Sequence, residues 1–198
     1  MLERAPRVAA VALLVPALVQ AWLASATGLS MPLQATVFVG LAVFAVLLLA
    51  SMAIVALRLP SRWAIAGLLA WTVGWVAMSA DLSASIRWAF GGAPPMGPHQ
   101  LHVLDASLVQ VVATAGGLVI GSSIATSFHD ARTRHSIFVL LAGYALFGLL
   151  VVRLEHQIAL VTDFPGLSAL RKDRALTDAL RSFAMAGVLW LHGRRARG

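Results

Sequence analysis

The chain contains no cysteine, which excludes disulfide bonds, thiolate metal ligands and cysteine-based catalysis. Charge is also scarce, because only 12% of the residues are charged, against about 25% in a typical soluble domain. Lys172 is the only lysine, so no apolar run holds a lysine that could form a Schiff base with a retinal-type cofactor. No glycine-rich loop precedes a lysine in the way that phosphate binding requires.

Apolar residues make up 60% of the 198-residue chain, and the mean hydropathy is +0.86. They gather in six blocks, and a helix of about 20 apolar residues crosses the roughly 30 Å hydrocarbon core of a bilayer. We therefore expect an all-α, polytopic transmembrane helical bundle that forms one integral membrane domain over residues 1–198. The six spans are expected at about 8–26, 35–57, 63–80, 103–128, 137–161 and 180–192. Residues 162–177 are expected to form the longest outer loop, with a helix-compatible stretch at 171–174, which lies on the outer surface of the membrane or docks on a neighbour.

The distribution of charge predicts how this bundle is oriented. With six spans, nine of the 15 basic residues but only two of the eight acidic residues fall on the side of the two termini. Because cytoplasmic loops are enriched in Arg and Lys, we expect both termini to be cytoplasmic in a multi-pass protein of a bacterial inner membrane. The basic residues are scattered among the loops and form no continuous basic face, so the lipid bilayer is an expected partner and nucleic acid is not.

Two alternatives would leave five spans. Arg4 and Arg7 precede the first block, and Ala24-Ser25-Ala26 ends it, which is also the pattern of a cleaved secretory signal peptide. The last block is short and could instead be an amphipathic helix that lies in the membrane interface.

Small residues recur every fourth position in the fourth block, at Ala113, Gly117, Gly121 and Ala125. Such a stripe lets two helix backbones approach closely in lipid. We expect it to serve helix packing, within the chain or against a partner subunit.

Polar residues that could carry chemistry gather at the expected outer ends of the spans. His99, His102 and Asp105 are three residues apart and share one helix face. Two imidazoles and a carboxylate on one face can bind zinc, copper or iron. The candidate metal ligands are His99, His102, Asp105 and His156, and the candidate polar site consists of Asp81, Asp105, Arg153 and Glu155. A purely structural polar rim, with Asp105 paired to Arg153, is the alternative.

No catalytic motif, no soluble domain and no charge at mid-membrane depth can be recognised, and no cofactor is identified. We therefore expect a non-catalytic subunit or accessory factor of a larger membrane complex, with other membrane proteins as partners. One alternative is a small transporter or channel that uses Asp105, Glu155 and His156. A second alternative is a metal- or haem-dependent redox enzyme of the membrane.

Overall fold

The computed structural model describes residues 4–25, 31–72 and 99–195, with short stretches in which only the backbone is described. Within these ranges the chain consists of helices and short turns, without strands, so the all-helical prediction is confirmed for them. The helices are α1 (Ala5–Ser25), α2 (Met31–Arg58), a segment at Trp63–Thr72, α4 (His99–Thr126), α5 (Ala131–Leu160) and α6 (Phe164–Arg195).

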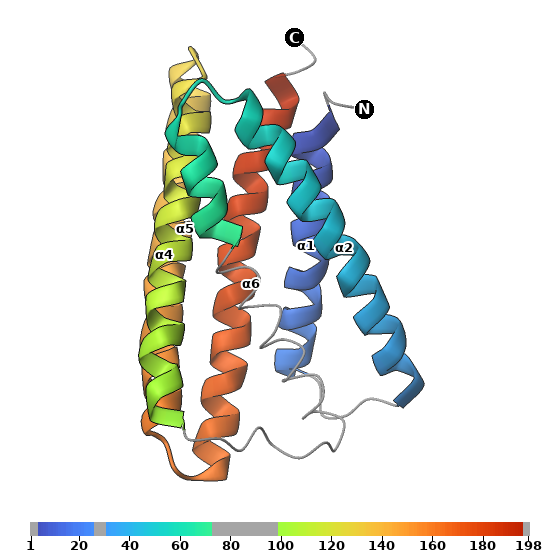
Figure 1. Cartoon of the computed structure of the whole chain (residues 1–198), viewed down its shortest axis with the longest axis vertical. Helices are drawn as coiled ribbons and strands as arrows, with labels where there is room; N and C mark the ends of the chain where they lie inside the picture. The colour runs from blue at the N-terminus through green and yellow to red at the C-terminus, as the bar shows by residue number, and fades with distance from the viewer. Residues whose placement is uncertain (1–3, 26–30, 73–98, 196–198) are drawn as a thin grey trace.

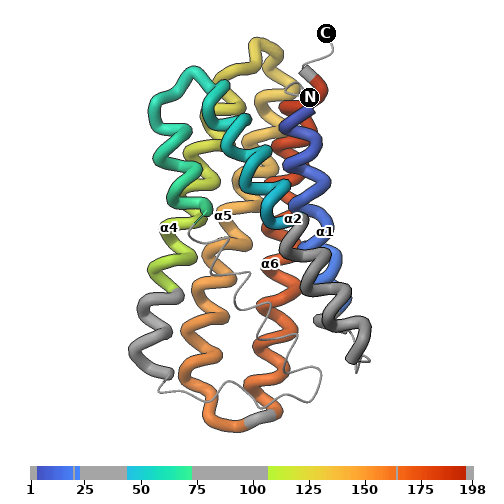
Figure 2. The backbone as a smooth tube through the Cα atoms, turned by 45° about the vertical axis from the view of Figure 1, so that its right-hand side comes forward, coloured from blue at the N-terminus to red at the C-terminus, as the bar shows by residue number. Residues whose placement is uncertain are grey.

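Helix α6 lies in the centre of the bundle (Figure 1). It packs against α1 on one side and against α5 on the other, while α2 covers α1 and α4 covers α5. Helices α4, α5 and α6 run side by side (Figure 2). Helix α1 begins and α6 ends at the same end of the bundle, where a Cβ atom on Gly193 would lie 2.6 Å from Cγ of Arg7. We call this the terminal end.

Among the described residues, two helical stretches are long and apolar enough to cross a membrane, Ser107–Thr126 and Ala131–Leu160. Where side chains are described, shorter apolar helical stretches are found at Ala5–Val19, Phe44–Arg58 and Trp63–Thr72. By length and composition, these helices support a membrane protein without establishing six spans. The second half of the predicted span at 63–80 lies outside the described residues.

The last helix differs from its prediction. We expected a surface loop at 162–177 and a short span at 180–192, but α6 begins at Phe164 and has 32 residues, which is about 48 Å of helix. Asp163 starts it, because the Gly166 backbone N–H donates to Asp163 Oδ2 at 3.1 Å and Pro165 suits a first turn. Met185, Val188 and Leu189 of this helix are fully buried in the bundle, and the interfacial alternative stays a prediction.

The turn between α4 and α5 is fixed by Asp130, the N-cap of α5. Its carboxylate accepts hydrogen bonds from the Thr133 hydroxyl, from the Thr133 backbone N–H and from the Arg132 backbone N–H. These bonds favour the charged form, so they lower the pKa of Asp130 below its usual 3.8. This turn lies at the terminal end, where the Phe128 ring is 6.2 Å from the ring of His192.

Glycine brings two pairs of backbones close together. A Cβ atom on Gly116 of α4 would lie 2.5 Å from the carbonyl oxygen of Gly67, so the segment Trp63–Thr72 and α4 touch through their main chains. On the other face of α4, a Cβ atom on Gly121 would overlap the side chain of Leu141. Gly117 and Gly121, from the predicted small-residue stripe, thus face α5, and Ala113 and Ala125 of the same stripe are buried.

Candidate functional site

The charged residues of α6 differ in how deeply they are buried. Lys172 and Asp173 are exposed, whereas Arg174, Asp178 and Arg181 are buried. The spacing of the buried three, i, i+4 and i+7, puts them on one helix face, and that face points into the bundle. Buried charge of this kind is costly unless each group is paired and hydrogen-bonded, so the surroundings of these residues define the site.

Arg181 lies near the middle of α6 and is bound by side chains of two other helices. Its Nη1 donates to Gln110 Oε1 at 2.7 Å, and its Nη2 donates to Thr114 Oγ1 at 3.0 Å and to the Tyr144 hydroxyl at 3.2 Å. The guanidinium carbon also lies 5.0 Å from the centroid of the Tyr144 ring, within range of a cation–π contact. We call Arg181, Gln110, Thr114 and Tyr144 the mid-bundle cluster.

The acceptors of the mid-bundle cluster are themselves oriented by the backbone. The Tyr144 hydroxyl donates to the carbonyl of Ala113 at 3.1 Å, and the Thr114 hydroxyl donates to the carbonyl of Gln110 at 2.7 Å. Each hydroxyl therefore donates its hydrogen bond to a backbone carbonyl of α4 and accepts a hydrogen bond from Arg181. The cluster is held in one arrangement because every hydroxyl has both a donor and an acceptor role.

Two carboxylates balance the two arginines. Arg174 Nη2 lies 2.6 Å from Glu155 Oε1 of α5, and Arg174 Nε lies 3.7 Å from Asp178 Oδ2. Arg181 Nη1 lies 3.9 Å from Asp178 Oδ1. We call Glu155, Arg174, Asp178 and Arg181 the buried ionic network. Its formal charges sum to zero, and each of the four residues is at most 8% exposed.

Glycines make the room that the mid-bundle cluster occupies. A Cβ atom on Gly117 of α4 would overlap the hydroxyl and ring of Tyr144 from α5. Conversely, a Cβ atom on Gly148 of α5 would lie 2.5 Å from Oγ1 of Thr114 on α4. Tyr144 of α5 therefore packs against Gly117 of α4, and Thr114 of α4 packs against Gly148 of α5. This packing brings both hydroxyls close to Arg181.

The exposed charges of α5 give a depth scale for the site. Arg134 and Arg153 are exposed, and no charged residue lies between them. Their separation of 19 residues is about 28 Å of helix, close to the hydrocarbon thickness of a bilayer. Tyr144 lies halfway between them, while Glu155 lies just beyond Arg153. The buried ionic network thus runs from one end of this zone to its middle.

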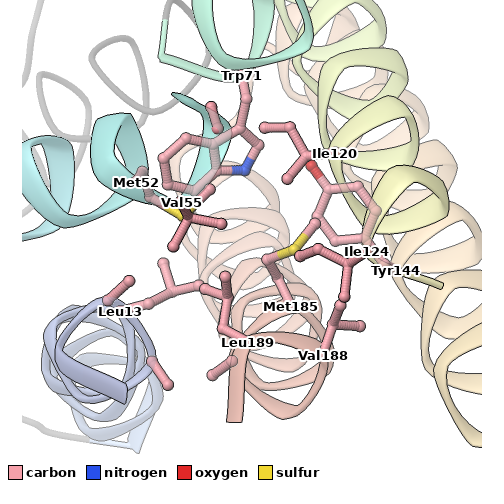
Figure 3. Close-up of a cluster of buried hydrophobic side chains, with 14 of the residues drawn as sticks. Leu13, Met52, Val55, Trp71, Ile120, Ile124, Tyr144, Met185, Val188 and Leu189 are labelled. Atoms are coloured by element: carbon pink, nitrogen blue, oxygen red, sulfur yellow. The ribbon is translucent and has the colours of Figure 1, made fainter. Parts of the chain in front are cut away.

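From the middle to the terminal end the described interior is mostly apolar. Met185, Val188 and Leu189 of α6 continue the face that carries Arg181 and are fully buried. They pack with side chains of the other helices in one cluster (Figure 3). The labelled members of that cluster include Leu13, Met52, Val55, Trp71, Ile120, Ile124 and Tyr144. Among the described residues, the buried ionic network thus lies in one half of the bundle, while the other half is mostly apolar, with Ser51 and Ser123 also buried there.

The structure separates the predicted site residues. Glu155 is buried and paired with Arg174, whereas its neighbours Arg153 and His156 are exposed. Asp81 lies outside the described residues, and so do the side chains of His99, His102 and Asp105 at the start of α4. The described side chains contain no group of three that could hold a metal ion. The metal prediction therefore stays a prediction.

Arg174, Asp178 and Arg181 were missed because they lie in what was taken for a loop and its junction with a short span. Arg181 is a buried charge near the middle of the bundle, and the expectation that no charge lies at mid-membrane depth stays a prediction. The sequence does contain a signal for a helix with buried charges. The three charged residues keep helical spacing, and Leu176 and Leu180 lie on the exposed side of the helix. Comparison of the chain with protein-family models, with curated proteins and with solved structures finds no match.

Proposed function

We propose that the chain is a small six-span transporter that moves an anion together with a proton through the buried ionic network. The observation that carries this proposal is Arg181, a charged side chain in the middle of the bundle bound by residues of α4 and α5. Ionisable residues at membrane depth are costly, and they commonly mark the path of an ion, proton or solute.

The pattern of exposure supports a bundle immersed in lipid. Large apolar side chains are exposed all along its helices, whereas a soluble protein rarely exposes so large an apolar surface. Helix α6 is too polar to pass as a span by composition, yet from residue 174 to 191 its exposed side chains are Leu176, Leu180 and Trp190. Its charges at that depth face inward, so lipid would meet an apolar helix surface.

The charged ends support the orientation expected from the sequence. At the terminal end the exposed basic residues include Arg4, Arg58, Arg62, Arg132, Arg134 and Arg194, and Asp130 is the one acidic residue described there. This excess of arginine favours a cytoplasmic terminal end in a bacterial inner membrane. The absence of cysteine allows a direct test: His129→Cys and Lys172→Cys should react with a membrane-impermeant maleimide from opposite faces of the membrane.

The balance of charge suggests how a proton and an anion are coupled. A proton on the Asp178 carboxylate removes one negative charge and leaves the Arg174–Arg181 pair with an excess positive charge. An anion bound at Arg181 restores neutrality, which a low-dielectric interior favours. Because Met185, Val188 and Leu189 fill the interior between Arg181 and the terminal end, release to that side requires their packing to open.

Flux in proteoliposomes tests this function. The purified chain is reconstituted with an internal pH-sensitive dye, and chloride, acetate and phosphate are supplied as probes. Asp178→Asn and Arg181→Gln should each lower the flux by more than about tenfold, since breaking one partner of a buried charge pair costs 2–5 kcal/mol. The matched controls are Asp173→Asn on the exposed face of α6 and Arg153→Gln on α5, which should stay within about twofold.

A folding defect must be separated from a defect in transport. The double variant Asp178→Asn/Arg181→Gln keeps the network neutral, so it should fold, as judged by size-exclusion chromatography and thermal unfolding, and yet transport nothing. The proposal fails if the wild type moves none of the three probes faster than empty liposomes. It also fails if the folded double variant transports as well as the wild type.

The other two functions considered from the sequence remain predictions. The subunit interpretation rested in part on the absence of charge at depth, and Arg181 removes that support. Stoichiometric co-purification of other membrane proteins in mild detergent would favour it over a transporter that acts alone. Metal analysis and a visible absorption spectrum of the purified chain would test the redox alternative that uses His99, His102, Asp105 and His156.

A further inference from the structure

A groove opens on the outside of the bundle between α4 and α5, with a volume of 380 Å³. Its walls are Leu118, Val119 and Ser122 from α4 and Phe138, Ala142 and Ala145 from α5. It lies on the terminal side of Tyr144, outside the buried ionic network.

The groove is hollow and apolar for identifiable reasons. Ala142 and Ala145 carry only a methyl group where α5 would otherwise fill the space. Gly121 draws α4 onto Leu141, which closes the floor between the two helices. The Ser122 hydroxyl donates to the Val119 carbonyl at 3.1 Å, so the one polar side chain of the wall is engaged with its own helix. A hydrocarbon chain fits such a surface better than a polar ligand does.

A cation lies at the terminal end of the same groove. Arg134 is one turn before Phe138, two turns before Ala142 and three turns before Ala145, so all four residues share one face of α5. Arg134 is exposed, and Arg132 beside it is exposed as well. The nearby carboxylate of Asp130 already accepts hydrogen bonds from the backbone and from Thr133. It therefore serves the turn and does not cancel both arginines.

We propose that this groove is a specific site for an anionic phospholipid. One acyl chain lies in the groove along Phe138, Ala142 and Ala145, and the phosphate pairs with Arg134 at the headgroup level. Charge complementarity supports this occupant. A cation at one end of an otherwise apolar groove matches an amphiphile that has a negatively charged head and a hydrocarbon chain. A partner helix would need no cation at that position. The site does not depend on the proposed transport activity.

The test compares two lipids of equal chain length, phosphatidylglycerol and phosphatidylcholine, titrated onto the full chain and read by native mass spectrometry. The wild type should bind phosphatidylglycerol more tightly. Arg134→Gln should weaken that binding roughly fivefold, the effect of one basic residue near the membrane surface, and leave phosphatidylcholine unchanged. Ala142→Trp should fill the groove and weaken the binding of both lipids.

Two matched variants serve as controls. Arg153→Gln removes an exposed arginine from the other end of α5, and Ala115→Trp adds the same bulk to an exposed position of α4 outside the groove. Neither should change lipid binding. Equal affinity of the wild type for the two lipids would overturn the proposal. So would an Arg134→Gln variant that keeps its preference, an Ala142→Trp variant that binds like the wild type, or a co-purified protein that occupies this face.

Discussion

Removing Arg181 and Asp178 together should cost less stability than removing either residue alone. In Arg181→Met the network keeps one positive and two negative charges, and in Asp178→Leu it keeps two positive charges and one negative charge. Breaking a buried ion pair in this way costs about 3–5 kcal/mol, because it leaves the network with one uncompensated charge. In the double variant Arg174 and Glu155 remain, 2.6 Å apart and neutral as a pair.

The expected coupling can be worked out from the contacts. Two unit charges about 4 Å apart interact by about 4 kcal/mol at an effective dielectric constant near 20, and Arg181 lies 3.9 Å from Asp178. The double variant still loses the three hydrogen bonds of Arg181, which together contribute about 2 kcal/mol at the average measured inside membranes. We therefore expect each single variant to lose about 3–5 kcal/mol and the double variant about 2 kcal/mol.

Reversible unfolding in mixed micelles, titrated with sodium dodecyl sulfate and followed by tryptophan fluorescence, measures all four free energies of the cycle. A control cycle of Arg153→Met on α5 and Asp173→Leu on α6 uses exposed residues and should show no coupling. If the losses at Arg181 and Asp178 add to within about 0.5 kcal/mol, the usual limit for independent sites, the idea of one neutral network is wrong.

Two further changes test the packing and the helix start. Gly117→Val should destabilise the bundle by about 1–3 kcal/mol, since its side chain would overlap Tyr144. In contrast, Gly143→Ala should be neutral or stabilising in thermal unfolding, because the nearest side-chain atom is 3.9 Å from the added Cβ atom. Asp130 has a lowered pKa in the folded chain, so its stabilisation of α5 is present above the usual carboxyl pKa and is lost as the pH falls through the lowered value. Hydrogen exchange of the backbone amides in the first turn of α5 should therefore accelerate in acid. Asp130→Ala should accelerate this exchange already at neutral pH. An unchanged exchange rate in that variant would contradict the capping role of Asp130.

The apolar helices could be read from the sequence because lipid-facing and core residues alike are apolar, so long blocks stand out. Helix α5 is the clearest case, with its run from Ile137 to Val152 uninterrupted by charge. The full length of α6 was not predicted, because its charges at 174, 178 and 181 interrupt the apolar run although these side chains are buried. An average over all residues cannot tell an inward charge from an outward one.

The site depends on pairings between residues far apart in the chain, and these have no local signature. Arg181 binds Gln110, 71 residues earlier, and Tyr144, 37 residues earlier. Glu155 was selected from the sequence for its position at a helix end, but its partner Arg174 was assigned to a loop. The sequence identifies Gly117 as a packing residue. It does not show that Tyr144 packs against this glycine, because that contact depends on how α5 lies beside α4.

The order of these residues along the chain has a consequence for biogenesis. Among the described residues, the hydrogen-bond and ion-pair partners of Arg174 and Arg181 outside α6 belong to α4 or α5, which precede it. A ribosome makes the N-terminal segments first, so the acceptors are already in place when the last helix emerges. In a circular permutant that moved α6 to the front, both guanidiniums would leave the ribosome before their described partners in α4 and α5.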